Sequence, residues 1–229
     1  MSAETRPELA RRLFAPLGPS YQRAGAVLSL GQDPRWRRFL VSRVPPLSRV
    51  LDVATGTGAV ARLLLDRGCV VTGLDQSPEM LRVARDGLGA RAVFVEGRAE
   101  QLPFEGGSFD ALTFTYLLRY VERPGEVLRE LARVVRPGGT MAMLEFFVPR
   151  APWRLAWDVY VDGVLPAAGR AFGPEWEEVG RFLGPSIRDF WERTPLDRLL
   201  DLWRDVSVAE PRFCVMSLGG GIVVWGTRT

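Results

Sequence analysis

Two aspartates and two glycines have the residue types and the spacing of a ligand-binding turn. The apolar run at residues 50–54 contains Asp52 and leads into a turn with Gly56 and Gly58, in the pattern D-x-x-x-G-x-G. Glycine lets the backbone bend sharply and lets a ligand approach it closely. Asp75 ends the next apolar run, where a carboxylate can accept hydrogen bonds from ribose hydroxyls. The four residues predict a site for a nucleoside-containing ligand, with a purely structural turn as the alternative.

A parallel sheet is needed to bring these residues together. We expect strands near residues 49–54, 69–75, 91–96, 109–115 and 139–147, and helices near residues 58–67, 78–86 and 124–135. Strands that alternate with helices are typical of a parallel sheet, whose ligands bind at the carboxyl ends of its strands. Ser77 and Pro78 predict the cap and the first residue of the second helix. The Pro-Gly-Gly at residues 137–139 is expected to stop the third.

The flanking segments have their own patterns. Residues 7–15, 21–30 and 34–44 look helical, and Asp33 is expected to cap the third of these helices. After the last predicted parallel strand, a long aromatic-rich segment interrupts the alternation. Residues 196–203 predict a helix, and residues 205–213 and 214–225 predict a terminal strand pair, the second bent by glycines at 219–221.

Three strings resemble the motifs of class I S-adenosylmethionine (SAM) methyltransferases: VLDVATGTG at residues 50–58, GLDQSPEML at 73–81 and RPGGTMAMLEF at 136–146. The string YQRAGAVLSLGQDPRWRRFL at residues 21–40 and the aromatic segment resemble the menaquinone/ubiquinone-biosynthesis C-methyltransferases. This resemblance implies a doubly wound α/β fold with a mainly parallel, seven-stranded, Rossmann-like sheet. It also implies one methyltransferase domain over residues 1–229, with N-terminal helices in residues 1–48 and a helical cap insertion at about 148–194.

SAM is the cofactor that the resemblance implies. The residues expected to bind it are Tyr21, Asp52, Ala54, Thr55, Gly56, Gly58, Asp75, Gln76, Met80, Arg98, Ala99, Glu100 and Thr115. Arg98 replaces an acid of the family's motif, so we expect it to stack on the adenine ring instead. Gln22, Gly25, Tyr120 and Trp225 also depart from the family's pattern.

The resemblance further implies a small acceptor, such as a lipophilic quinol of the demethylmenaquinol type. Methyl transfer to a ring carbon requires a phenolic proton to be lost or shared. The chain has no His and no Lys, which leaves three candidates open: a water held by Arg119, Tyr120 as a phenolate, or Asp158. An oxyanion stabilised by Arg119 is the favoured interpretation.

Other functions are compatible with the same glycine turn. A methyltransferase of another small molecule or secondary metabolite is the first alternative. A dinucleotide-dependent reductase and a SAM-binding protein without catalysis are the others. Thermal shifts with SAM and NADPH would separate the reductase, because a ligand that binds only the native state stabilises it.

Composition limits the remaining functions. A net charge of +3 suggests no nucleic-acid partner, and the spacing of Cys69 and Cys214 suggests no metal site. We expect both cysteines to be buried free thiols. The sequence shows neither a spanning apolar run nor a signal peptide, so we expect a cytoplasmic protein. A homodimer is left open, as is peripheral contact with an anionic membrane through the arginine-rich segment at residues 35–43, although a solvated helix face with a buried Trp36 is favoured there.

Overall fold

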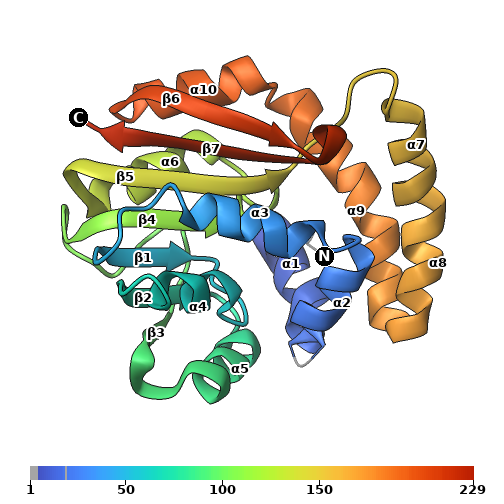
Figure 1. The fold of residues 1–229 in the computed structure, drawn as a ribbon, viewed down its shortest axis with the longest axis horizontal. Helices are drawn as coiled ribbons and strands as arrows, with labels where there is room; N and C mark the ends of the chain where they lie inside the picture. The colour runs from blue at the N-terminus through green and yellow to red at the C-terminus, as the bar shows by residue number, and fades with distance from the viewer. Residues whose placement is uncertain (1–4, 19) are drawn as a thin grey trace.

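The computed structural model describes residues 5–18 and 20–229, which fold around a seven-stranded sheet (Figure 1). The strand order is β3-β2-β1-β4-β5-β7-β6. The bounds of the strands are β1 (Arg49–Val53), β2 (Val70–Asp75), β3 (Val93–Glu96), β4 (Phe109–Thr115), β5 (Val135–Phe146), β6 (Val208–Met216) and β7 (Gly221–Arg228). The predicted fold class, a doubly wound and mainly parallel sheet, is confirmed.

The order of the strands reverses between β1 and β4. From β1 the chain builds outward through β2 and β3, then returns to place β4 and β5 on the other side of β1. Strand β1 pairs in parallel with both β2 and β4, whereas β7 runs antiparallel between β5 and β6. A crevice forms at the carboxyl ends of the strands where such an order reverses, which makes this edge the expected ligand site.

Helices cover both faces of the sheet. The bounds of the helices are α1 (Arg6–Phe14), α2 (Tyr21–Leu28), α3 (Gln32–Val41), α4 (Ala59–Leu65), α5 (Pro78–Leu88), α6 (Pro124–Val134), α7 (Arg154–Val159), α8 (Leu165–Gly169), α9 (Pro174–Arg193) and α10 (Leu196–Asp205). Helices α3 and α4 contribute to the core on one face, and α6 and α10 to the core on the other.

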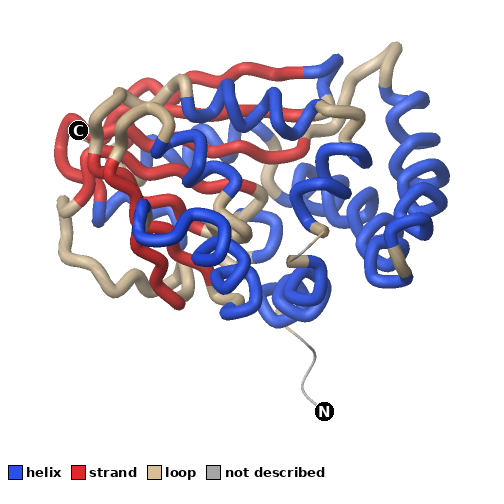
Figure 2. Tube along the Cα trace, turned by 60° about the horizontal axis from the view of Figure 1, so that its bottom comes forward, coloured by secondary structure: helices blue, strands red, loops and turns tan. Residues whose placement is uncertain are grey.

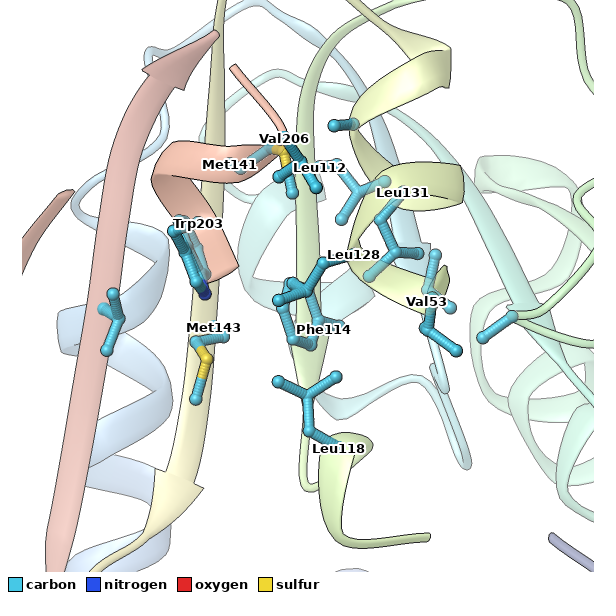
Figure 3. Packing of buried hydrophobic residues seen from close by; sticks show 14 of the residues in the cluster. Val53, Leu112, Phe114, Leu118, Leu128, Leu131, Met141, Met143, Trp203 and Val206 are labelled. Atoms are coloured by element: carbon cyan, nitrogen blue, oxygen red, sulfur yellow. The ribbon is translucent and has the colours of Figure 1, made fainter. Parts of the chain in front are cut away.

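The core between the sheet and helices α6 and α10 fixes the position of β4. Figure 3 shows Phe114 of β4 surrounded by Leu128 of α6, Trp203 of α10 and Met143 of β5. All four side chains are at most 1% exposed, and the rings of Phe114 and Trp203 stack at 6.2 Å between centroids. The chain that leaves β4 therefore starts from a rigid strand.

A helical layer lies beyond the carboxyl ends of the strands (Figure 2). Helices α1 and α2 lie between the sheet and the group formed by α7, α8 and α9 (Figure 1). The indole of Trp176 in α9 donates a hydrogen bond to Ser20 Oγ at 2.9 Å, and the hydroxyl of Tyr160 donates to the carbonyl of Leu28. Helices α7 to α9 occupy the segment where the sequence predicts a cap.

Several local expectations are confirmed or corrected. Ser77 caps α5, since its Oγ accepts the Met80 N–H at 3.2 Å. The predicted cap role of Asp33 is wrong, because α3 already begins at Gln32 after the left-handed Gly31. Helix α6 ends at Val134, before the Pro-Gly-Gly at 137–139, and the chain enters β5 directly.

The terminal strands are shifted from their predicted positions. Helix α10 extends to Asp205, so β6 starts at Val208, and Cys214 belongs to β6 rather than to β7. The left-handed residues Ser217 and Leu218 form the turn between the strands, and Gly219 lies in that turn instead of bending β7. Cys69 and Cys214 are both free thiols, but only Cys69 is buried. Throughout the described residues, we find no helix with the length and apolar character needed to cross a membrane.

We predict that Leu128→Ala destabilises the fold by about 2–5 kcal/mol, because the fully buried side chain leaves a cavity beneath β4. Urea denaturation measures the loss. The control is Leu155→Ala, at a side chain that is 73% exposed, which should change stability by less than about 0.5 kcal/mol. Equal effects of the two substitutions would contradict the described packing.

Candidate active site

A cavity of about 550 Å³ opens where the carboxyl ends of β1, β2 and β4 meet the helical layer. The predicted site residues that line it are Tyr21, Ala54, Thr55, Gly56, Asp75, Gln76, Met80, Arg98, Ala99, Glu100, Thr115, Arg119 and Tyr120. Asp52, Gly58 and Asp158 are not among the lining residues. The fold thus gathers most of the predicted set around one space.

The glycine turn is fixed by Asp75. One carboxylate oxygen of Asp75 accepts the Gly56 N–H at 2.8 Å, and the other accepts the Ser77 N–H at 2.9 Å. Gly56 has a φ of +55°, and a Cβ added there would meet no atom within 4 Å, so its backbone faces open space. Each carboxylate oxygen keeps a further lone pair. Asp75 can therefore order the turn and still accept hydrogen bonds from a ligand.

Asp52 and Gly58 support the turn from behind. Asp52 is 1% exposed, and its carboxylate accepts hydrogen bonds from Thr55 Oγ1 at 2.6 Å and Thr113 Oγ1 at 2.7 Å. Burial raises the pKa of Asp52 to about 6, although both hydroxyl donors lower it. A Cβ on Gly58 would lie 2.9 Å from a methyl group of Leu88. Both residues position the turn from outside the cavity wall.

The expected adenine region is formed by the loop after β3. Arg98 and Glu100 form an exposed ion pair at 3.3 Å, and the buried Ala99 lies between them on the cavity wall. Stacking of Arg98 on an adenine ring stays a prediction. Gln22 contacts the glycine turn instead, since its Nε2 donates to both the carbonyl and the hydroxyl oxygen of Thr57.

Arg119 lies at the cavity wall in a fully buried ion pair. Its Nε is 3.0 Å from Glu145 Oε1, and both side chains are 1% exposed. The guanidinium also lies over the rings of Tyr120 at 4.7 Å and Phe146 at 5.2 Å. Burial raises the pKa of Glu145, and Arg119 offsets only part of that rise. The two groups lie at ion-pair distance without the geometry of a hydrogen bond, and neither Nε nor Nη1 of Arg119 finds a hydrogen-bond partner among the described residues.

The other two catalytic candidates differ in position. Tyr120 lines the cavity and is 8% exposed, and burial raises the pKa of its hydroxyl, which opposes a resting phenolate. Asp158 is bound outside the cavity wall by Arg154 at 2.8 Å and Arg188 at 3.0 Å. The structure therefore does not bring Asp158 together with Arg119 and Tyr120.

The model of the "ubiE/COQ5 methyltransferase family" matches residues 2–227 of this chain. The chain belongs to this family. The "Demethylmenaquinone methyltransferase" of Renibacterium salmoninarum is 37% identical over 97% of this chain and 92% of its own length. The protein of the same name from Roseiflexus castenholzii is 33% identical over 98% of this chain and 95% of its own length. The protein is accordingly a SAM-dependent methyltransferase.

Solved structures support the fold. A SAM-dependent methyltransferase of Thermotoga maritima, described as a possible histamine N-methyltransferase, superposes with a TM-score of 0.65 at 19% identity and covers 96% of this chain and 99% of its own. At that identity the likeness shows the fold alone. The cavity fits the cofactor, because it combines the Asp75 carboxylate with an open glycine turn.

Sequence reasoning missed three polar residues of the methyltransferase's cavity: Asp33, Arg37 and Tyr116. Asp33 and Arg37 lie one turn apart on α3, and Tyr116 directly follows β4. The position of Tyr116 at the carboxyl end of a strand was a usable signal. Glu145 was also missed, although it comes near the carboxyl end of β5.

We predict that Arg119→Met destabilises the methyltransferase by about 3–5 kcal/mol, because Glu145 is left buried without its partner and must either stay charged or take up a proton. Arg119→Met combined with Glu145→Leu should recover most of this loss, since no charge remains. Urea denaturation measures both. The control is Arg154→Met, which removes an exposed pair and should cost at most about 1 kcal/mol. If the double variant is as unstable as the single one, the ion pair is not the cause.

Proposed function

We propose that this methyltransferase transfers the methyl group of SAM to a ring carbon of a lipophilic quinol of the demethylmenaquinol type. The observation that carries the proposal is the aromatic lining of the cavity beyond the glycine turn. The aromatic residues that line the cavity are Phe14, Tyr21, Trp36, Tyr116, Tyr120, Phe146, Trp157, Tyr160 and Trp176. The names of the two curated relatives point to the same acceptor class. In this proposal, residues 1–229 form one domain, and residues 148–194 are its cap.

The chain's own residues would do three things for this reaction. SAM supplies a methyl group that is already activated, so the protein must align the acceptor and exclude water. The aromatic walls would hold the flat ring. Arg119, with its unpaired Nη1, would donate a hydrogen bond to the oxygen on which negative charge develops. Asp75 would hold the ribose of the cofactor.

The test is transfer of a labelled methyl group from SAM to a panel of reduced naphthoquinones and benzoquinones. We predict methylated product from a demethylmenaquinol analogue. We also predict that Asp75→Ala weakens SAM binding by about 1.5–3 kcal/mol in calorimetry, the range for hydrogen bonds to a charged group. Asp86→Ala, an exposed acid on α5, is the matched control.

Each alternative function has its own outcome in this experiment. Methylation of a non-quinol acceptor would show that the substrate is another small molecule. Tight SAM binding without any product would favour a binding protein, and stabilisation by NADPH instead of SAM would favour the reductase. Unchanged SAM affinity in Asp75→Ala would remove Asp75 from the cofactor site.

We also propose that the mouth of the cavity rests on an anionic membrane surface, on the cytoplasmic side. Leu30 lines the cavity yet is 72% exposed, and Leu218 is 63% exposed. Their segments meet where Ser217 Oγ donates to Gln32 Oε1 at 2.6 Å. The exposed arginines Arg35 and Arg38 follow on α3. Apolar side chains flanked by cations suit the interface of an anionic bilayer. Trp36 and Arg37 are buried and take no part.

We predict that the protein floats with phosphatidylglycerol-containing vesicles and not with pure phosphatidylcholine. Leu30→Asp with Leu218→Asp should abolish flotation, because it puts charge into the contact. Leu47→Asp is the control, since Leu47 is 80% exposed at the opposite end of the sheet, before β1. Flotation that survives the double substitution would exclude this surface.

A further inference from the structure

Asp33, Arg37 and Tyr116 form a continuous chain of hydrogen bonds in the cavity wall. The hydroxyl of Tyr116 donates to Asp33 Oδ1 at 2.6 Å, and Arg37 Nε donates to Asp33 Oδ2 at 2.8 Å. All three residues line the cavity, although Tyr116 and Arg37 are only 8% exposed. A nearly buried carboxylate between a cation and a phenol is therefore in reach of a bound acceptor.

The position of Tyr116 is fixed from several sides. It follows β4 immediately and has a φ of +55°, a conformation that costs energy in a residue with a bulky side chain. Its ring stacks on Phe146 at 4.4 Å, and its backbone N–H donates to the carbonyl of Leu144 at 2.9 Å. The strain aims the hydroxyl at Asp33, and strained residues of this kind cluster at functional sites.

Before the reaction, Arg37 and Tyr116 in this hydrogen-bond chain both keep their protons. Burial lowers the pKa of Arg37, but Asp33 and its other neighbours raise it by more, so the guanidinium stays protonated. Burial and then the charge of Asp33 hold the pKa of the Tyr116 hydroxyl well above its ordinary value. Tyr116 thus keeps its proton at rest, and its oxygen has a lone pair that can accept another hydrogen bond.

We propose that Tyr116 and Asp33 form a proton relay that accepts the hydroxyl proton of the quinol, an inference that rests on the proposed function. The ring carbon forms a bond to the methyl group while the sulfur–methyl bond breaks and its electron pair stays on sulfur. The quinol O–H proton passes to the oxygen of Tyr116, and the proton of Tyr116 passes to Asp33 Oδ1. The O–H electron pair becomes part of the new carbonyl group.

The ring then regains its aromaticity. The methylated carbon releases its hydrogen as a proton to solvent, and Asp33 returns the first proton through Tyr116 to the quinol oxygen. The net products are the methylated quinol, S-adenosylhomocysteine and one proton. A carboxylate is basic enough for this role, because methyl transfer to the ring draws electrons from the hydroxyl oxygen and makes its proton strongly acidic.

The other ionisable groups at the cavity are less suited to accept this proton. Asp75 already accepts two backbone N–H groups in the cofactor region. Arg119 is a cation paired with Glu145, and the hydroxyl of Tyr120 has no hydrogen-bond partner among the described residues to which it could pass a proton. Glu100, on the loop after β3, is paired with Arg98 at 3.3 Å in the expected adenine region. Asp158 lies outside the wall. Asp33, reached through Tyr116, remains.

The test compares kcat for the quinol in Tyr116→Phe, Asp33→Asn and the double variant. Each single substitution should lower kcat by about 10²–10⁴, the usual contribution of a general base. The double variant should be no slower than the worse single one, because both residues serve one path. SAM affinity should stay within about twofold of the wild-type value. The control is Asp86→Asn, which removes the acid of the exposed Arg82–Asp86 ion pair on α5 and should leave kcat unchanged.

A quinol with electron-withdrawing substituents separates proton transfer from a structural role. Its more acidic hydroxyl needs less help, so the defect of both variants should shrink at least about tenfold. The relay alone would be overturned if both variants kept the wild-type kcat. It would also be overturned if the loss of kcat were the same on both quinols and paralleled a loss of SAM binding. Failure of the wild-type protein to methylate any quinol would overturn the proposed function and the relay with it.

Discussion

The reversal of strand order between β1 and β4 is the constraint on which the site depends. Because the chain builds away from this point in both directions, nothing in the sheet covers the carboxyl ends of the two central strands. Asp75 ends β2, and the glycine turn and Tyr116 follow β1 and β4 at the same edge. The helical layer of α1, α2 and α7 to α9 turns this open edge into a cavity. Cofactor and acceptor therefore meet at the ends of buried strands, which hold their contacts rigidly.

Buried charges lie in the cavity wall or directly behind it, and stability alone would not favour them. Asp52 bonds to two threonines, Glu145 pairs with Arg119, and Asp33 pairs with Arg37. A buried ion pair rarely stabilises a fold more than apolar residues of the same shape would. What these pairs provide is fixed orientation in a region from which water is excluded. The core of Phe114, Leu128 and Trp203 supplies the stability that such an arrangement requires.

The sequence predicted what depends on neighbouring residues. The spacing of apolar residues and the turn residues located the strands. The cap at Ser77 was predicted correctly because a capping contact spans only three residues. The residues expected to bind the cofactor were chosen from motifs, and most of them line the cavity. What could not be predicted were contacts over long separations: Tyr116 meets Asp33 across 83 positions, and no local pattern in either segment reveals it. Asp33 was taken for a cap because the same residue type serves both roles. Glu145, the buried partner of Arg119, was also missed because the two residues lie far apart in the sequence.

The two halves of the cavity are held with unequal strength. The cofactor half is built from a sheet whose strands are tied by continuous ladders of hydrogen bonds. Helices α8 and α9 pack on α1 and α2 through an apolar cluster that includes Leu13, Leu28 and Leu165, and this cluster is far smaller than those on the two faces of the sheet. The polar contacts between them are few and include the bond from Trp176 to Ser20. Opening free energies are lowest where few buried contacts must break. The lipophilic quinol proposed above would need a wide entrance, whereas the cofactor needs a fixed pose. From this distribution of contacts we expect the acceptor side to open at a lower free energy than the cofactor side.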